Sequence, residues 1–186
     1  MKKTFVTILL LIGVVSGLTP VDAQKAQDED VAILIQQLTA SDLPEIRVKA
    51  ADTLARISRE NPETVKPFEA ELIQVLNTPD IDIYLLRRIV QILGSIKSVN
   101  AVPFLIHHLS QQDVGEAIVK ALIQIGVPAL PHLRRALSDG NPLAVSRAAI
   151  ALGRIKDMES VPQLIVLLKH PDHMVRRSAI SVLGFI

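Results

Sequence analysis

The sequence contains no cysteine and no tryptophan, and aromatic residues make up only 3% of it. The absence of cysteine excludes any disulfide and any lipid-modified cysteine, so packing alone must hold the folded chain together. Hydrophobic residues are nevertheless 49% of the chain and charged residues 21%, a balance typical of a folded protein. Because Leu, Ile, Val and Ala supply nearly all of the apolar side chains, the composition favours stacked helices.

Residues 1–23 have the organisation of a secretory signal peptide. Lys2 and Lys3 form a basic start, residues 4–18 are an apolar run, and small residues precede a cleavage position after Ala23. The run is shorter than the roughly 20 residues needed to cross a bilayer core. We therefore expect cleavage, no stable membrane insertion afterwards, and a mature protein in the periplasm or at the cell surface. An uncleaved membrane anchor is the alternative.

The mature chain has no excess of either charge. Removing Lys2, Lys3 and Asp22 from 20 basic and 19 acidic residues leaves equal numbers of each. The acidic residues outnumber the basic ones before residue 100, and the reverse holds after it. This balance, together with the few aromatic side chains available for base stacking, argues against a nucleic-acid partner.

A short polar lead is expected at residues 24–30, and residues 31–186 divide into five similar units, each predicted to be a helix, a turn and a second helix. The second helices are predicted at 46–57, 84–96, 115–126, 143–155 and 173–186. Aligning their ends places Ala55, Gly94, Gly126, Gly153 and Gly184 at equivalent positions. The spacing is about thirty residues, which is typical of a solenoid.

The first helices also begin alike. The sequences VPFLIHHL, VPALPHLRRAL and VPQLIVLL start at residues 102, 127 and 161, and proline suits the first helical turn because its missing amide hydrogen has no acceptor there. Asp and Asn in the following turns can cap the second helices. One helix pair cannot cover its own apolar face, so stacking of the units supplies the core. A compact helical bundle is the alternative.

The segment LLKHPDHMVRRSAISVLG carries a recognisable order of residues: an apolar first helix, a turn Asp, then V-R, A and L-G. This order resembles the short HEAT-like repeats named after phycobilisome lyases, and the resemblance covers about residues 31–186, although the V-R order is missing from unit two. The resemblance implies an all-α, right-handed α–α superhelix whose second helices line the concave wall. It implies no single function, because similar repeats serve as adaptors, chaperones, lyases and hydroxylases.

Signatures of catalysis are missing. The di-iron hydroxylases among HEAT-like proteins carry His-Glu dipeptides, and this sequence has none. It also lacks a G-x-S-x-G nucleophile motif and a phosphate-binding glycine loop. His170, Asp172 and His173 are close in sequence, but a capped turn explains them better than a metal site does. We predict no catalytic residue, no metal and no cofactor.

Basic residues recur on the second helices and are the main candidates for partner contact. The candidates are Arg87, Arg88, Lys120, Arg147 and Arg177. Arg47 and Arg176 follow the V-R pattern more closely, and the resemblance implies that they bond the turn Asp of a neighbouring repeat. For the arginines as a set, the alternative is that they hold the repeats together rather than contact a partner.

The last unit ends on an apolar segment, and we expect it to form a docking face. The residues proposed for this face are Leu164, Leu168, Phe185 and Ile186. Self-association through this unit is therefore predicted. The alternatives are that the face docks on a partner, or that a further repeat of a longer array packs against it. Together these features predict an exported, non-catalytic protein-interaction scaffold with an unidentified protein partner. The alternatives are an accessory or chaperone subunit of an envelope enzyme, and a lyase or isomerase acting on a bound prosthetic group.

Overall fold

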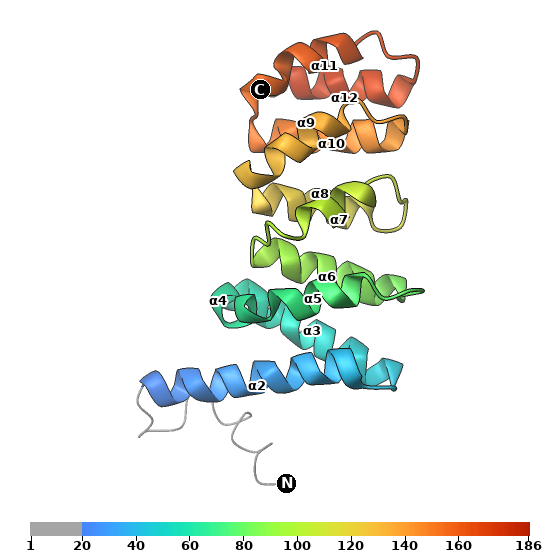
Figure 1. Ribbon diagram of the computed structural model, residues 1–186. Coiled ribbons are helices and arrows are strands. Elements are labelled where there is room, and N and C mark those ends of the chain that lie inside the picture. Colours follow the sequence, from blue (N-terminus) through green and yellow to red (C-terminus); the bar gives the residue numbers. More distant parts are fainter. Residues whose placement is uncertain (1–19) are drawn as a thin grey trace.

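The protein is a stack of helix pairs (Figure 1) in the computed structural model, which describes residues 20–186. The described residues contain helices and no strand, which confirms the all-α solenoid. Residues 1–19 of the expected signal peptide lie outside the described residues, and the expected cleavage position after Ala23 falls in the first turn of a helix. None of the described helices is both long and apolar enough to span a bilayer.

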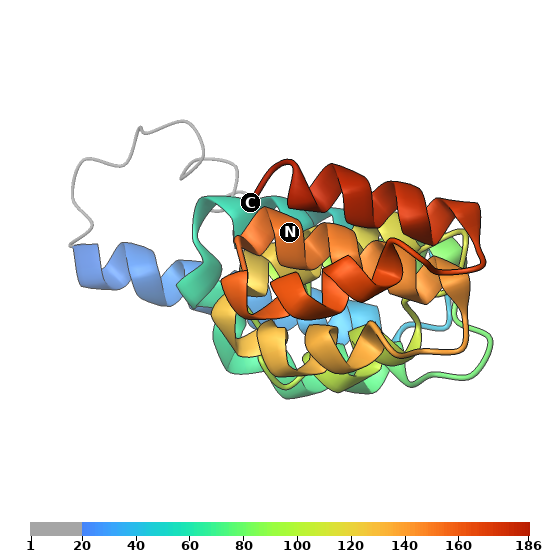
Figure 2. The ribbon, with the colours of Figure 1, turned by 90° about the horizontal axis from the view of Figure 1, so that it is seen from above.

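Two layers of helices run along the stack, and Figure 2 shows them seen from one end. The first helices of the units are α2 (Pro20–Ala40), α4 (Pro62–Val65) with α5 (Glu69–Leu76), α7 (Val102–His107), α9 (Leu130–Ala136) and α11 (Val161–Leu167). The second helices are α3 (Pro44–Glu60), α6 (Ile83–Ser95), α8 (Gly115–Ile125), α10 (Pro142–Ile155) and α12 (His173–Leu183). Short 3-10 turns at Lys66–Phe68, Val127–Ala129 and Met158–Ser160 precede α5, α9 and α11.

Residues 24–30, expected to form a short polar lead, are helical in the structure. Helix α2 begins at Pro20 and continues without interruption to Ala40. The segment QKAQDED contains no glycine or proline, and most of its residues are good helix formers. Polarity alone therefore does not end the helix, and proline at its first position suits a helix start.

The expected start signals of the later helices are confirmed. Proline lies in the first turn of α7 and α11, and the VPA sequence of unit four forms the 3-10 turn that leads into α9. Three second helices begin with a side-chain cap, in which Asp82, Asn141 or Asp172 accepts hydrogen bonds from two backbone amides of the first turn. Each cap stabilises its helix by about 1 kcal/mol.

The core lies between the two layers and is aliphatic throughout. Its largest fully buried side chains are Leu and Ile residues, among them Leu54, Ile89 and Leu122 from successive second helices. Second helices contact their neighbours more extensively than first helices do. Glycine permits this approach at two places: a Cβ at Gly94 would lie 2.8 Å from the Cα of Ala121, and one at Gly153 would lie 2.7 Å from Cγ1 of Val182.

Unit two is longer than the others, which explains the wide spacing between Ala55 and Gly94. The additional residues form α4 and the 3-10 turn Lys66–Phe68 before α5. Thr64 and Val65 of α4 are buried, so the insertion is part of the core rather than a surface loop.

Candidate functional site

The second helices form a continuous surface, here called the second-helix face, and it contains two adjacent grooves. The polar groove has a volume of about 470 Å³ and is lined by Arg87, Arg88, Gln91, Gln112, Asp113, Glu116, Ala117, Lys120, Ala121 and Gln124. The apolar groove has a volume of about 900 Å³ and is lined by Glu116, Val119, Lys120, Ile123, Leu143, Ser146, Arg147, Ile150, Arg154, His173, Met174, Arg177 and Ser178. Glu116 and Lys120 belong to both grooves.

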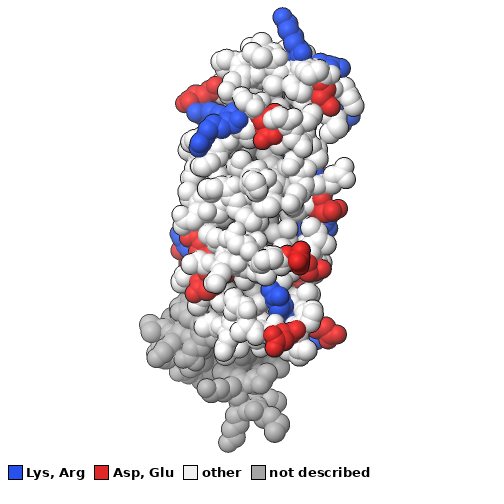
Figure 3. Space-filling view, turned by 45° about the vertical axis from the view of Figure 1, so that its right-hand side comes forward, with Lys and Arg blue, Asp and Glu red and all other residues white. Residues whose placement is uncertain are grey.

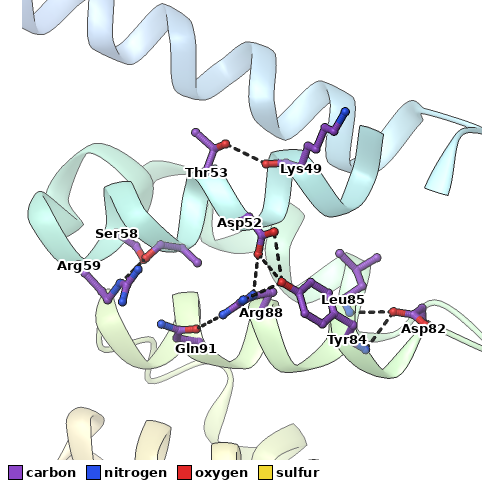
Figure 4. Close-up of polar contacts among 11 residues, drawn as sticks. Lys49, Asp52, Thr53, Ser58, Arg59, Asp82, Tyr84, Leu85, Arg88 and Gln91 are labelled. Carbon is purple, nitrogen blue, oxygen red and sulfur yellow. Dashed lines mark hydrogen bonds and ion pairs between the residues drawn. The ribbon is translucent and has the colours of Figure 1, made fainter. Parts of the chain in front are cut away.

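Arg88, at the margin of the polar groove, is the centre of a closed hydrogen-bond network (Figure 4). Its guanidinium pairs with Asp52 of α3, with 2.6 Å between Nε and Oδ1, and donates to the hydroxyl of Tyr84 and to Gln91 at 2.7 and 3.1 Å. The Tyr84 hydroxyl in turn donates to Asp52 at 2.9 Å. The bond to Tyr84, helped by the Asp52 charge, raises the pKa of Arg88 further, so this side chain is a cation held within the protein. Its buried Nε contacts Asp52 as an ion pair without forming a hydrogen bond.

Arg87 and Arg147 come from different units and bond the same turn, the α7–α8 turn of unit three. Arg87 Nε donates to the carbonyl of Asp113 at 2.6 Å. Nη1 of Arg147 donates to the carbonyls of Leu109 and Gln111, both at 2.7 Å. Units two and four thus supply the cations that bond this turn. Helix α8, which follows the turn, has Lys120 as its one basic residue.

Gly115 provides the space that Arg147 occupies. A Cβ at position 115 would overlap the Arg147 guanidinium, so glycine is needed there for close approach rather than for a special backbone angle. Burial lowers the pKa of Arg147, and the carbonyl oxygens around it replace water as hydrogen-bond acceptors.

Arg47 and Arg176 hold the turn of their own unit. Each lies four residues after the N-cap of its second helix, at Leu43 and Asp172 respectively. Arg47 donates to the carbonyl of Leu38 at 3.0 Å, and Arg176 donates to the carbonyls of His170 and Pro171. The expectation that they would bond the turn Asp of a neighbouring repeat is wrong, because backbone carbonyls of the same turn are closer and Asp172 is occupied in capping α12.

Two of the five predicted contact residues form no hydrogen bond or ion pair within the described part of the stack. Within the described residues, Lys120 and Arg177 form no ion pair and no hydrogen bond, and both side chains are exposed in the apolar groove. Partner contact stays a prediction for all five. The structure favours Lys120 and Arg177, since Arg87, Arg88 and Arg147 would have to give up internal bonds to contact a partner.

An ion pair between units lies away from the grooves and was not anticipated from the sequence. Arg134 of α9 donates two hydrogen bonds to Asp157, in the loop before α11, and a third to Glu159. These bonds hold the pKa of Asp157 below its ordinary value.

Figure 3 shows that the side of the stack it presents is mostly uncharged across its middle, with charged side chains scattered toward the margins.

The histidines and the acidic residues of the last turn do not gather into a metal site. No group of three possible metal ligands occurs among the side chains that the structure describes, those of residues 30–186. His170 Nδ1 accepts a hydrogen bond from the amide of Asp172, whose carboxylate caps α12. These two side chains are therefore engaged in the turn.

The last unit presents an apolar surface that differs from the expected docking face. Leu164 is fully buried in the core, so its place in that face is wrong: the apolar stripe of α11 turns it toward α12. Leu168 and Phe185 are 37% and 55% exposed, and Ile186 is half-buried against the core. Ile165 and Ile180 are more exposed than Leu168.

Several residues of the apolar groove were not identified from the sequence, among them Ile150, Met174 and Arg154. The two apolar side chains are 38% and 42% exposed. The sequence contains a feature that points to Ile150. This large apolar residue lies among alanines, on the same side of α10 as the polar Ser146. An apolar residue in line with polar ones on a helix face indicates a contact surface.

The geometry defines an α–α solenoid whose second helices present an open, partly apolar groove. Residues 69–150 and 131–186 match the family model described as HEAT repeats, so the chain belongs to the HEAT-repeat family. No curated protein matches the chain in sequence.

Two solved structures resemble the fold. One is an engineered protein from a structural genomics consortium, with 22% identity over 84% of this chain and 47% of that one and a TM-score of 0.52. The other is the complex of CpcE and CpcF of phycocyanin lyase from Nostoc sp. PCC7120, with 25% identity over 82% of this chain and 63% of that one and a TM-score of 0.53. The chain thus spans about half of the first and less than two thirds of the second.

Proposed function

We propose that this protein is an exported, non-catalytic scaffold that binds a protein partner on its second-helix face. The observation that carries the proposal is the apolar groove, where apolar side chains and unpaired cations from three second helices remain accessible. Membership of the HEAT-repeat family supports it, because such repeats commonly mediate protein interactions. The apolar segment after Lys2 and Lys3 supports export to the periplasm or cell surface.

Photo-crosslinking in the native host tests the proposal. A photoreactive residue in place of Ile150 or Met174 is expected to give a discrete crosslinked product in the envelope fraction. The same residue in place of Val127, which is 71% exposed at the start of unit four, serves as the matched control and is expected to give none. Equal labelling from all three positions, or none from the groove, contradicts the proposal.

A separate experiment tests export and cleavage of the signal peptide. Mass spectrometry of the protein recovered from the periplasm or cell surface should show a chain that begins at Gln24. Recovery of the full-length chain from the membrane fraction would favour the uncleaved anchor, and recovery from the cytoplasm would contradict export.

The other candidate functions are an accessory or chaperone subunit of an envelope enzyme, and a lyase or isomerase that acts on a bound prosthetic group. The likeness to the phycocyanin lyase complex is the observation in favour of the lyase. The expected export opposes a direct analogue, because bilin attachment to antenna proteins takes place inside the cell. Purification of the mature protein separates the enzyme from the scaffold: a visible chromophore or a stoichiometric metal favours the enzyme, and a colourless protein with a groove-crosslinked partner favours the scaffold.

Self-association through the last unit accompanies this proposal. Ile165, Ile180 and Phe185 of unit five are 53%, 62% and 55% exposed and supply the apolar surface for this contact. Replacing Phe185 by Glu and Ile186 by Lys is expected to shift the mature protein toward monomer. Light scattering behind size-exclusion chromatography measures this, and an unmutated chain that stays monomeric across a wide concentration range would rule it out.

A further inference from the structure

The floor of the apolar groove is built from side chains at helical spacing. Val119 and Ile123 lie one turn apart on α8, Leu143 and Ile150 lie on α10, and Met174 lies on α12. Residues four or seven apart share a helix face, so α8 and α10 each contribute a pair of apolar side chains to the floor, and α12 contributes Met174. Ile150 and Met174 remain 38% and 42% exposed. This exposure shows that the groove is open, whereas a site for a small molecule usually encloses most of its ligand.

The charges of the groove are nearly all of one sign. Its basic residues are Lys120, Arg147, Arg154 and Arg177, and its single acidic residue is Glu116. Arg147 is engaged by the carbonyls of unit three, and Arg154 lies 5.5 Å from the centre of the Phe185 ring. No acidic residue among those described forms an ion pair with Lys120, Arg154 or Arg177. These cations are therefore available to an external partner.

We propose that the apolar groove binds an acidic amphipathic helix of the partner protein, an inference that rests on the proposed scaffold function. The apolar stripe of such a helix covers the floor, and carboxylates beside the stripe pair with Lys120 and Arg177. A nucleic acid would leave the apolar floor without a matching surface, and no Phe, Tyr or Trp lines the groove for base stacking. A basic or neutral helix would leave the cations unpaired beside an apolar interface.

The dimensions of the groove set the length of the helix. Packed helices lie about 8 to 10 Å apart, so a groove that crosses α8, α10 and α12 extends for about 20 Å. At a rise of about 1.5 Å per residue, a helix of about 13 residues spans that distance. A peptide of about 16 residues, with Leu at positions i, i+4, i+7 and i+11 and Glu beside them, is therefore a suitable probe.

Fluorescence anisotropy with the mature protein tests the proposal. Three labelled peptides are compared: the Leu/Glu peptide, the same peptide with Lys in place of Glu, and the same peptide with Ser in place of Leu. The Leu/Glu peptide is expected to bind at least about tenfold more tightly than either analogue, which corresponds to about 1.4 kcal/mol. Its affinity should fall as salt is added, because salt screens exposed charge pairs.

Charge reversal in the groove gives a second, independent measurement. The double variant Lys120→Glu with Arg177→Glu is expected to weaken Leu/Glu binding at least about tenfold and to strengthen binding of the Leu/Lys peptide. Neither side chain has an internal bond among the described residues, so folding should be unaffected, and circular dichroism checks this. The variant Lys97→Glu with Lys169→Glu changes the net charge equally outside the groove and should change binding less than twofold.

Each failure has a distinct meaning. Equal binding of the Leu/Glu and Leu/Lys peptides, or unchanged binding by the groove variant, overturns the acidic-helix proposal. If Ile150 and Met174 crosslink a partner in the envelope while the Leu/Glu peptide fails to compete for it, the scaffold function stands and this inference fails. If the peptide binds as expected but the groove crosslinks nothing in the envelope, the scaffold function fails.

Discussion

The polar and apolar grooves share Glu116 and Lys120, yet their cations are used differently. In the polar groove, Arg88 is bonded to Asp52, Tyr84 and Gln91, and Arg87 is bonded to the α7–α8 turn. In the apolar groove, Lys120 and Arg177 form no ion pair with any described residue, although Ile150 and Met174 next to them are exposed. The same residue types at similar places on the second helices therefore stabilise the stack at Arg87, Arg88 and Arg147 and remain free at Lys120 and Arg177.

This difference shows how to separate structural from functional cations in a repeat protein. A cation that bonds backbone carbonyls or a carboxylate within the stack loses those bonds when it is removed, so its removal costs stability. A cation without internal bonds costs little stability on removal, and its effect appears in binding. The predictions below test this separation, starting with the largest expected effect on stability.

Removing the Arg147 side chain should have the largest effect. Arg147→Ala removes the bonds to the carbonyls of Leu109 and Gln111, of which the second keeps only the Gly115 amide, and it opens space beside Gly115. We therefore expect a loss of about 2 to 3 kcal/mol in the free energy of unfolding. Arg177→Ala, the matched change at a cation without internal bonds in the same groove, should stay within about 0.5 kcal/mol of the parent. Urea denaturation followed by circular dichroism measures both. Equal losses would mean that the two kinds of cation are not distinct.

Gly115→Ala should reproduce most of the Arg147→Ala effect without touching the arginine. The added methyl group occupies the position of the guanidinium, which must then leave the turn. The losses should not add: the double variant is expected to be about as stable as Arg147→Ala alone. Additive losses in the double-mutant cycle would show that glycine at position 115 has a role independent of Arg147.

The network at the polar groove should respond more weakly. Tyr84→Phe removes the hydroxyl that joins Arg88 to Asp52 but leaves their ion pair, and the site is partly exposed, so we expect a loss of about 1 kcal/mol. Binding of the Leu/Glu peptide should not change, because Tyr84 lines neither groove. A large fall in peptide affinity without a fall in stability would place the binding site at the polar groove instead.

The sequence predicted the repeat architecture well because each unit repeats its own signals. The prolines at the first turns, the Asn and Asp caps, and the apolar spacing are local features, and each acts within one helix or turn. The start of α2 was missed because the polar segment before it contains helix formers and no breaker. The Gly positions looked equivalent, but Gly94 and Gly153 allow close helix contact, whereas Gly126 ends α8 at a φ of 76°.

The roles of individual arginines could not be predicted because they depend on the turns of other units. Arg47 and Arg176 share a position relative to their helix caps, and both bond their own turn. Arg147 lies two residues further along its helix, so it reaches the preceding unit instead. A shift of two residues moves a side chain to another face of a helix. Which carbonyls that side chain contacts then depends on how the neighbouring units are stacked.

The smallest effect is expected where a paired charge lies outside both grooves, at Asp157. Arg134 lowers the pKa of Asp157 below its ordinary value of 3.8, so the unfolded chain binds this proton more readily than the folded one. The contribution of Asp157 to stability is therefore complete above that value and is lost as the pH falls through the lower, folded pKa. Asp157→Asn should reduce the urea midpoint at pH 7, and the gap between variant and parent should narrow progressively below about pH 4. Glu159→Gln, which alters an exposed partner of the same arginine, should change the midpoint less at either pH. A gap that stays constant on acidification would show that Asp157 stabilises the loop through its shape and hydrogen bonds and not through its charge.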